Sequence, residues 1–372
     1  MARAGTDEYP LLSMTMRDGL VDQSAKFKKR VASNDVSDYK VVRRGQLVVG
    51  FPIDEGVLDF QSLYDAGIVS PAYGIWDLCD DTRVDVEYLK KYLRSARAMA
   101  YYKAKLRGST ARRRSLPAEI FLALPVPLPP LDEQRRITAI LDHAAALRAK
   151  RRQVLAHLDD LTQAIFHDMF GDPATWASRW PMGVIGDMTQ SAQYGTSAKA
   201  GDSGEWPILR MGNVTDSGRL DLRDLKYIDL SVADVPKYTV RRGDMLFNRT
   251  NSKEKVGKTA VVRTDRSLAL AGYLVRVRCK PEHQSEFVSA YLTSPFGQAI
   301  RRRLAKAAVN QANINASELQ RIPIALPSSD LQRKFTARIE SVDAQRTAVQ
   351  NLLISDDQLF ASLQSRAFRG EL

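Results

Sequence analysis

The chain has 372 residues, of which 44% are hydrophobic and 26% charged, an ordinary globular composition with enough length for two hydrophobic cores. Its 55 Lys and Arg residues against 43 Asp and Glu residues give a net charge of +12, which favours a polyanionic partner; a basic soluble protein without such a partner is the alternative. No apolar run approaches the ~18 residues of a membrane span, and the N-terminal segment lacks the apolar core of a signal peptide, so we expect a cytoplasmic protein with no membrane segment.

Short strands and turns are predicted for the first 130 residues. Apolar runs predict strands at residues 10–16, at 39–51 with a break at Arg44-Gly45, and at 73–79, and an apolar stripe predicts one helix over 84–106. Cys79 and Cys279 each follow a tyrosine by six residues. We therefore expect two equivalent buried positions at strand ends, with no disulfide and no metal.

Two basic runs in this part are candidate phosphate contacts. One consists of Lys26, Lys28, Lys29 and Arg30, and the other, in a loop after the helix, of Arg112, Arg113 and Arg114. A solvated charge run is the alternative for both.

A sixteen-residue segment occurs twice. LPVPLPPLDEQRRITA at 124–139 recurs 198 positions later as IPIALPSSDLQRKFTA at 322–337, and eight of the sixteen positions are identical. The identical residues of the first copy are Pro125, Leu128, Pro129, Asp132, Gln134, Arg135, Thr138 and Ala139. The same offset relates Val42-Arg43-Arg44-Gly45 to Val240-Arg241-Arg242-Gly243, so the chain is one unit used twice, with pseudo-twofold character.

Each copy is followed by a predicted long helix. Prolines forbid a helix before Leu131, and apolar residues then recur at heptad-like steps to Phe170; the second copy continues in the same way from residue 329. A helix of about 38 residues is roughly 57 Å long, more than one small domain can cover. We therefore expect an antiparallel two-helix coiled coil that separates two globular domains; packing of each helix against its own domain is the alternative.

The second β-rich part is predicted to carry different candidate contacts from the first. Strands are expected at 206–211, 239–247, 259–263 and 268–280, and a helix over 286–307 matches the helix of the first part. Two loops hold polar candidates: Arg249, Thr250, Asn251, Ser252, Lys255 and Lys258 in one, and Asn310, Gln311 and Asn313 in the other. Asn and Gln pair with adenine in the major groove, whereas Arg pairs with guanine or phosphate, so two DNA-binding parts of this kind would recognise different sequences.

The first part is also shorter. It has nine residues before its Pro10-Leu11-Leu12 strand, against 35 from Asp172 to Trp206 before the matching Pro207-Ile208-Leu209. The missing stretch corresponds to residues around 180–196, so we expect the first domain to be shortened at its N-terminus. An incomplete domain, a wrongly placed start and a compact variant are the alternatives.

No sequence pattern indicates catalysis by this chain. There is no Gly-rich cofactor loop after a strand, no Asn/Asp-Pro-Pro-Tyr/Phe of an amino-methyltransferase and no Cys/His cluster, and the four histidines are scattered. We therefore expect no catalytic residue, no metal and no cofactor bound by the chain itself.

The proline-rich entry, LPPLDEQRRI at the start of a long helix, and GDMLFNRTNS with VGKTA in the second half resemble the specificity subunit of type I restriction-modification systems. The resemblance implies an α+β chain with target-recognition domains at 1–130 and 171–328 and spacer helices at 131–170 and 329–372. It further implies a bipartite asymmetric site on double-stranded DNA. The implied partners are two adenine-N6 methyltransferase subunits, which use S-adenosylmethionine, and restriction subunits, which use ATP and Mg²⁺.

Two other functions are compatible with the residues. A solitary methyltransferase or nuclease with unfamiliar motifs would bind S-adenosylmethionine or cut DNA without partners. A stand-alone DNA-binding or scaffold protein would co-purify with something other than a methyltransferase.

Overall fold

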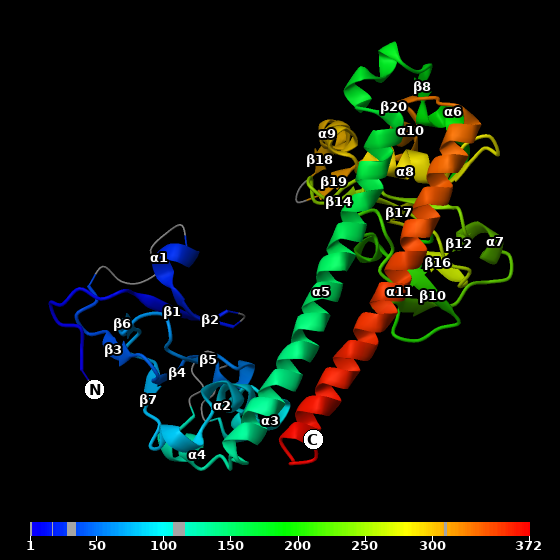
Figure 1. Ribbon diagram of the computed structural model, residues 1–372. Coiled ribbons are helices and arrows are strands. Elements are labelled where there is room, and N and C mark those ends of the chain that lie inside the picture. The colour runs from blue at the N-terminus through cyan, green and yellow to red at the C-terminus, as the bar shows by residue number, and fades with distance from the viewer. Residues whose placement is uncertain (1, 17, 28–34, 107–115, 309–310) are drawn as a thin grey trace. The chain divides into compact units, whose positions relative to one another are not determined.

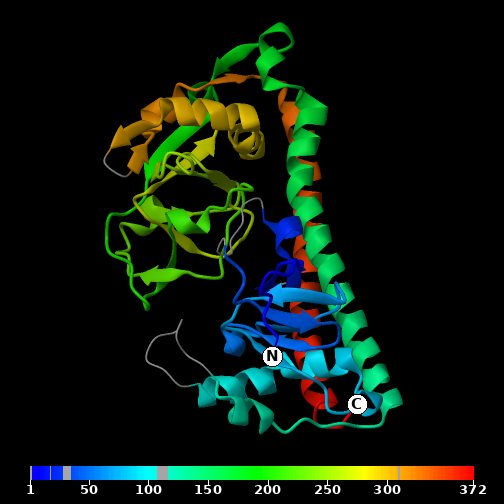
Figure 2. The same cartoon turned by 90° about the vertical axis from the view of Figure 1, so that its left-hand side faces the viewer.

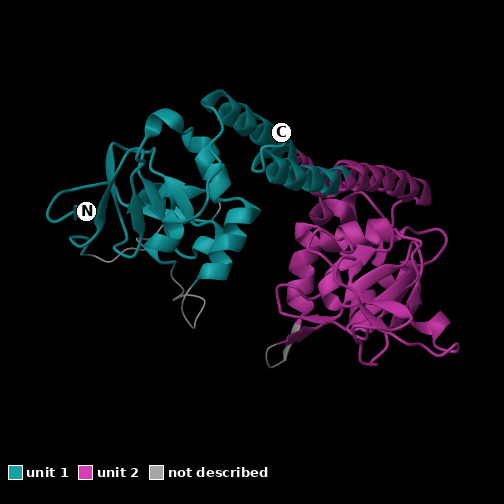
Figure 3. Ribbon diagram, turned by 90° about the horizontal axis from the view of Figure 1, so that it is seen from below, with its two compact units in different colours: residues 1–150, 352–372 teal, residues 151–351 magenta. Residues whose placement is uncertain are grey.

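The computed structural model (Figure 1) describes residues 2–16, 18–27, 35–106, 116–308 and 311–372. The chain divides into two compact units: unit 1 contains residues 1–150 and 352–372, and unit 2 contains residues 151–351. Each of the two long helices, α5 (Leu131–Phe170) and α11 (Ser329–Ala367), contributes one part to either unit, as the change of colour along them in Figure 3 shows.

Unit 1 has small antiparallel sheets and short helices. Its strands are β1 (Leu12–Thr15), β2 (Gly19–Asp22), β3 (Lys40–Arg43), β4 (Leu47–Val49), β5 (Leu58–Phe60), β6 (Ala66–Val69) and β7 (Gly74–Trp76). Its helices besides α5 and α11 are α1 (Gln23–Lys26), η1 (Ile53–Glu55), η2 (Asp81–Arg83), α2 (Val86–Leu93), α3 (Ala96–Lys105) and α4 (Ala118–Leu122). β1 pairs with β2, β3 with β6, and β4 lies between β5 and β7.

Unit 2 is larger and contains more strands. The strands are β8 (Met182–Val184), β9 (Thr189–Tyr194), β10 (Trp206–Leu209), β11 (Lys226–Ile228), β12 (Thr239–Val240), β13 (Met245–Asn248), β14 (Thr250–Asn251), β15 (Thr259–Val261), β16 (Leu268–Leu270), β17 (Leu274–Cys279), β18 (Lys306–Ala308), β19 (Gln311–Asn313) and β20 (Pro323–Ala325). The helices are η4 (Pro173–Ser178), α6 (Ile185–Met188), η5 (Met211–Asn213), α7 (Val235–Tyr238), α8 (Ser285–Thr293), α9 (Pro295–Leu304) and α10 (Ala316–Gln320).

The strands of unit 2 form two four-stranded sheets and two smaller ones. The orders are β11-β10-β16-β12, β15-β13-β17-β9, β14-β19-β18 and β20-β8, and α8 and α9 lie against the strands on one side (Figure 2). β9 and β8 come from residues 180–196, the stretch without a counterpart in the first half of the sequence. In unit 2 this stretch supplies the strand beside β17 and the partner of β20.

The long helices run antiparallel in both units. In unit 1, Arg148 of α5 donates to Asp357 of α11 (2.6 Å), and Arg136 donates to the carbonyl of Leu372 (2.7 Å). In unit 2, Arg346 donates to Asp159 (2.7 Å), and the rings of Phe170 and Phe335 are 5.4 Å apart. The residue number rises along one helix as it falls along the other. The helices therefore contact each other as well as their domains.

The repeated glutamine fixes each long helix to its domain. Gln134 and Gln332 are both fully buried. Gln134 accepts from the N–H of Asp85 (2.8 Å), just before α2, and donates to the carbonyls of Arg83 and Pro129 (2.9 and 2.7 Å). Gln332 accepts from the N–H of Gln284 (3.0 Å), just before α8, and its amide is 2.8 Å from the carbonyl of Pro327 and 3.3 Å from Nδ1 of His283.

Aromatic residues make equivalent contacts at this junction between helix and domain in both units. The hydroxyl of Tyr92 donates to the carbonyl of Pro125 (2.5 Å), and that of Tyr291 donates to the carbonyl of Pro323 (2.8 Å). At the end of each long helix, Phe170 packs on Phe287 (4.6 Å between centroids) and Phe368 on Tyr92 (5.1 Å). Each aromatic pair stabilises the fold by roughly 0.5–1.5 kcal/mol beyond the burial of its apolar area. Equivalent contacts therefore attach the long helices to the domain in each unit.

The predicted α+β class, with two β-rich parts, paired long helices and internal duplication, is confirmed. The prediction of one helix over 84–106 and one over 286–307 was wrong, because each region contains two helices. Ser95 caps α3 by accepting from the N–H of Ala98 (3.2 Å) and so separates it from α2, and Ser294 with Pro295 separates α8 from α9. The predicted burial of both cysteines was also wrong, because Cys79 lies beyond the end of β7 and is exposed, while Cys279 is half-buried; neither forms a disulfide.

Candidate nucleic-acid interface

The two polar loops predicted in the second half of the chain lie together in unit 2. Thr250 and Asn251 form β14, Gln311 and Asn313 belong to β19, and the strands pair with Thr250 opposite Asn313. β18 completes this small sheet on the other side of β19. The structure thus brings residues about 60 positions apart into one surface; Asn310 lies outside the described residues.

Arg249 is the most constrained of the predicted contacts. Its N–H donates to the carbonyl of Tyr273 (3.0 Å), and its carbonyl accepts from the N–H of Ile314 (2.9 Å). Its guanidinium carbon lies 4.9 Å from the centroid of the Tyr194 ring, and the Tyr194 hydroxyl accepts from the N–H of Ala316 (3.0 Å). Backbone and side chain are therefore both held in place before any ligand binds, which lowers the entropic cost of binding.

The Arg249 side chain also has unused hydrogen-bonding capacity. Its Nε is buried and has no hydrogen-bond partner within the described part of the chain. A guanidinium offers five N–H donors in a planar fork, which matches the two acceptors of a guanine edge or of a phosphate. Arg249 can thus donate to either without first breaking an ion pair.

The other predicted residues of unit 2 differ in accessibility. Gln311 and Lys255 are exposed, whereas the side chain of Thr250 is buried and packs within the sheet. Lys258 is 11% exposed and forms an ion pair with Asp216 at 2.6 Å, so its charge is already neutralised. The carbonyl of Ser252 accepts from the N–H groups of the turn that follows it, at Lys255 and Val256, so the backbone of Ser252 holds the turn that presents Lys255.

Of the candidates in unit 1, only Lys26 lies within the described residues. It is the last residue of α1, is exposed, and forms an ion pair with Asp18 at 2.8 Å. Lys28, Lys29 and Arg30, and likewise Arg112, Arg113 and Arg114, lie outside the described residues.

Two contributors to this surface were missed from the sequence. Tyr194 precedes Arg249 by 55 positions, and no local pattern links them. The run Arg301-Arg302-Arg303 in α9 was visible as a basic run. Its first member is buried and donates to the carbonyl of Val256 (3.2 Å), while Arg302 and Arg303 are exposed. Burial, and then Arg302, lower the pKa of Arg301 to about 10.

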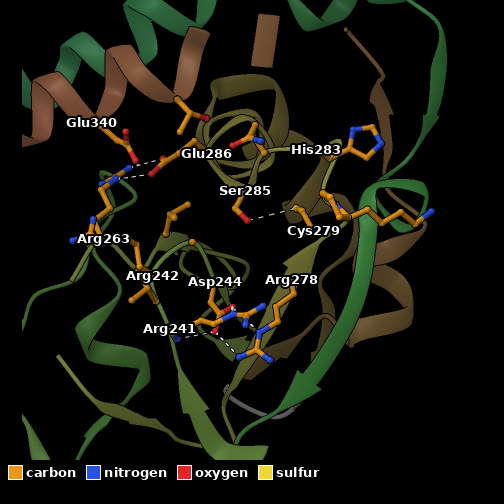
Figure 4. A pocket seen from close by; sticks show the side chains of 17 residues that line it. Arg241, Arg242, Asp244, Arg263, Arg278, Cys279, His283, Ser285, Glu286 and Glu340 are labelled. Carbon is orange, nitrogen blue, oxygen red and sulfur yellow. Dashed lines mark hydrogen bonds and ion pairs between the residues drawn. The ribbon is translucent and has the colours of Figure 1, made fainter. Parts of the chain in front are cut away.

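A pocket of about 270 Å³ lies elsewhere in unit 2, between the end of β17, the start of α8 and α11 (Figure 4). Two of its arginines are already paired: Arg278 donates to both oxygens of Asp244 (2.8 and 3.2 Å), and Arg263 to both oxygens of Glu286 (2.6 Å each). Burial raises the pKa of the Cys279 thiol in its wall, so that thiol is not an activated nucleophile.

Among the described residues, no helix combines the length and apolarity that a membrane span requires. In the same residues, no three His, Cys, Asp or Glu side chains are grouped closely enough to hold a metal ion.

Comparison with known proteins points to one family. Residues 178–355 match the family model described as Type I restriction modification DNA specificity domain. The EcoKI specificity subunit of Escherichia coli K12 is 26% identical over 267 residues, which cover 66% of this chain and 57% of that subunit. The putative MjaX specificity subunit of Methanocaldococcus jannaschii is 30% identical over 168 residues, covering 44% of this chain and 39% of that one. The chain thus spans about half the length of these curated relatives.

One solved structure resembles the fold along nearly the whole chain. It comes from work on complex assembly and conformational transition of the type I R-M system, and aligns with a TM-score of 0.60 over 98% of this chain and 92% of the other, at 17% sequence identity. At that identity the likeness establishes the fold, and the fold agrees with the family match.

Proposed function

We propose that this chain belongs to the specificity-subunit family of type I restriction-modification systems and that it recognises a bipartite, asymmetric site on double-stranded DNA. Each β-rich domain would bind one half-site. The observation that carries the proposal is the junction built twice, with Gln134 and Tyr92 in unit 1 and Gln332 and Tyr291 in unit 2, because a duplicated frame under two different polar surfaces suits two different half-sites.

Contact with DNA is proposed to centre on the β14–β19 surface in unit 2. Arg249 is pre-positioned on the ring of Tyr194, and Gln311 and Lys255 of the same unit are exposed. Phosphate contacts position a protein on the duplex, and contacts to base edges give specificity. Arg302 and Arg303 would contribute to positioning, and Arg249 and Gln311 to base recognition.

The partners are proposed to be two adenine-N6 methyltransferase subunits and ATP-dependent restriction subunits, with S-adenosylmethionine, ATP and Mg²⁺ bound by them in the cytoplasm. This chain would supply recognition and assembly and no catalytic group. The helix pair supports a docking role, since in unit 1 a groove of about 390 Å³ lies along it. Its lining includes Leu147 and Leu359, which are 39% and 54% exposed. Exposed apolar patches of this kind are typical of interaction sites.

The test is a map of N6-methyladenine in cells that carry the modification subunits, with and without this chain. We expect one asymmetric motif of two specific blocks separated by a fixed number of unspecified base pairs, and its disappearance when the chain is removed. Methylation that is unchanged without the chain, or confined to one continuous block, would contradict the proposal. Purified chain that alone binds S-adenosylmethionine or cuts DNA would instead favour a solitary enzyme.

A further inference from the structure

The two long helices carry the same interhelical ion pair in both units. In unit 1 Arg148 of α5 donates to Asp357 of α11 at 2.6 Å, and in unit 2 Arg346 of α11 donates to Asp159 of α5 at 2.7 Å. The two arginines are 198 positions apart, as are the two aspartates. The pair therefore belongs to the duplicated frame.

In unit 2 this ion pair is part of a larger group, here called the Arg219 network: Arg219, Arg263 and Arg346 with Asp159, Asp343 and Glu286. Arg219 lies 3.2 Å from Asp159 of α5 and also donates to Asp343 of α11. Arg263, which follows β15, reaches Asp343 at 3.5 Å and donates twice to Glu286 of α8 at 2.6 Å. The network thus joins both long helices to the body of the domain.

The centre of the network is shielded from solvent, and its charges are balanced. The side chains of Arg219, Arg263 and Glu286 are 8%, 14% and 6% exposed, whereas those of Asp159, Asp343 and Arg346 are 31%, 28% and 26% exposed. Burial, followed by the neighbouring Arg263, lowers the pKa of Arg219, while Asp343 and Asp159 oppose that shift. Three positive charges face three negative ones, and removing one partner of a buried ion pair is strongly destabilising because the other charge stays buried. Paired donors at fixed angles also restrict orientation.

Arg219 directly connects the long helices to a sheet that apolar packing joins to them only through the neighbouring sheet. The hydrophobic cluster of Leu209 and Leu270 also contains Leu246 of β13, Ala260 of β15 and Leu274 of β17 but, among the described residues, no member of α5 or α11. By contrast, the cluster under α8 includes Phe166 of α5 and Phe335 of α11. Arg219 lies in the turn between η5 and β11, and its neighbour Leu220 packs on the first of these clusters.

Among its described residues, unit 1 has the frame but no network of this size; there Lys91 of α2 forms an ion pair with Asp142 of α5 at 2.5 Å. Glu87 corresponds to Glu286 at an offset of 199 positions, but the position 198 before Asp343 is Ala145. Glu87 and Ala145 line a pocket of about 180 Å³ in unit 1. Asp343 in unit 2 forms ion pairs with two arginines, whereas the equivalent residue in unit 1, Ala145, lines a pocket.

We propose that Arg219, Arg263 and Asp343 lock the second recognition domain to the helix pair and so set the number of base pairs accepted between the two half-sites. This inference rests on the proposed function, since it concerns how a bipartite site is measured. One inserted base pair moves a half-site by about 3.4 Å along the duplex and turns it by roughly 35°, because a helical turn of 10–10.5 base pairs spans about 34–36 Å. A domain whose orientation on the helices is fixed binds such a rotated half-site more weakly. A loosely attached domain can rotate with the half-site and keep its affinity. Arg219, Arg263 and Asp343 are positioning residues, acting through the surface they orient.

The experiment uses the complex with its modification subunits and a set of duplexes whose half-sites are separated by the native spacing or by one or two base pairs more or less. The spacing preference is the ratio of the affinity for the native spacing to the affinity for an altered spacing. We expect Arg219→Ala to reduce this ratio by about tenfold or more, while the bases preferred in each half-site stay the same. Asp343→Asn, which changes little in shape, should act in the same direction.

Arg223→Ala is the matched control. Arg223 lies four residues from Arg219, is 83% exposed and pairs with Asp221 at 2.6 Å, so its loss removes the same charge without touching the network. It should leave the spacing preference unchanged. Hydrogen exchange of residues 206–228 supplies a readout independent of DNA, and Arg219→Ala should accelerate it across β10 and β11, whereas the effect of Arg223→Ala should stay local to the Asp221–Arg223 turn.

Unchanged spacing preference in both Arg219→Ala and Asp343→Asn would overturn the inference. If the wild-type complex makes no bipartite mark, the proposed function fails, and the exchange experiment decides the lock alone. Unchanged exchange at 206–228 in Arg219→Ala then refutes it, and accelerated exchange supports the attachment of this sheet through Arg219.

Discussion

Replacing Gln332 by leucine tests the account of the duplicated junction. The side chain is fully buried, and its amide is within hydrogen-bonding distance of the N–H of Gln284, the carbonyl of Pro327 and Nδ1 of His283. Leucine has similar bulk, so the substitution removes hydrogen bonds without leaving a large cavity. It leaves the N–H before α8 and the carbonyl before α11 buried and unpaired.

Each unpaired buried backbone group costs about 1–3 kcal/mol, so two of them predict a loss of roughly 2–6 kcal/mol in the free energy of unfolding of unit 2. With a urea dependence of about 1–3 kcal/mol per molar, the midpoint should fall by at least about 0.7 M. Tryptophan fluorescence reports on this unit, because Trp176, Trp180 and Trp206 lie in unit 2 and only Trp76 lies in unit 1.

Arg333→Ala is the control for this substitution. Arg333 follows Gln332 on the same helix, its side chain is 59% exposed, and its loss should change stability by less than about 0.5 kcal/mol. If Gln332→Leu shifts the midpoint no more than Arg333→Ala does, the repeated glutamine does not hold the helix to its domain, and its recurrence needs another cause.

Three further outcomes are expected. Arg249→Lys, and separately Gln311→Ala combined with Asn313→Ala, should each relax one half-site by about 1–3 kcal/mol per lost base contact in a methylation-motif assay; unchanged motifs would remove these residues from the recognition surface. A thiol reagent should modify Cys79 before Cys279, because Cys79 is exposed whereas burial raises the pKa of Cys279; Cys79→Ser should abolish the fast phase. Arg223, chiefly by hydrogen bonding, lowers the pKa of Asp221 from 3.8 to about 2, so the stability that this carboxylate contributes is complete above pH 3.8 and is lost as the pH falls toward 2; Asp221→Asn should flatten acid unfolding in that window.

The fold was largely predictable because identical residues in the segments 124–139 and 322–337 reveal the duplication. The starts of α5 and α11 follow from prolines that forbid helix and from heptad spacing, and the pairing of the helices follows from an apolar seam too long for one domain. The breaks before α3 and α9 were missed because helical periodicity persists across Ser95 and Ser294. Pro295 was a usable signal, since proline is favoured in the first turn of a helix.

The sequence predicted which loops form the candidate interface, but not which of their residues are exposed on it. The asparagines and arginines near 250 and 311 were visible as polar runs, but their pairing as β14 and β19 depends on long-range register. Burial also cannot be inferred from polarity alone: Thr250 packs inside, and Lys258 is paired with Asp216, a residue 42 positions earlier. The Arg249–Tyr194 contact joins the residue between β13 and β14 to the last residue of β9 and has no local sequence pattern.

Comparing the two copies separates the frame from the surfaces it carries. Positions that are the same in both copies, such as Gln134 and Gln332 or Arg148 and Arg346, lie where a long helix meets its domain or the other helix. Positions that differ lie on the polar surface, as in the strand of Asn313, or in the attachment of the domain, as in Asp343 against Ala145. If the chain presents two unlike half-sites to like partners, as proposed, that division follows, because a partner that binds twice requires the same frame twice. The Arg219 network is one place where the two copies differ, and its removal should loosen the second domain from the helix pair.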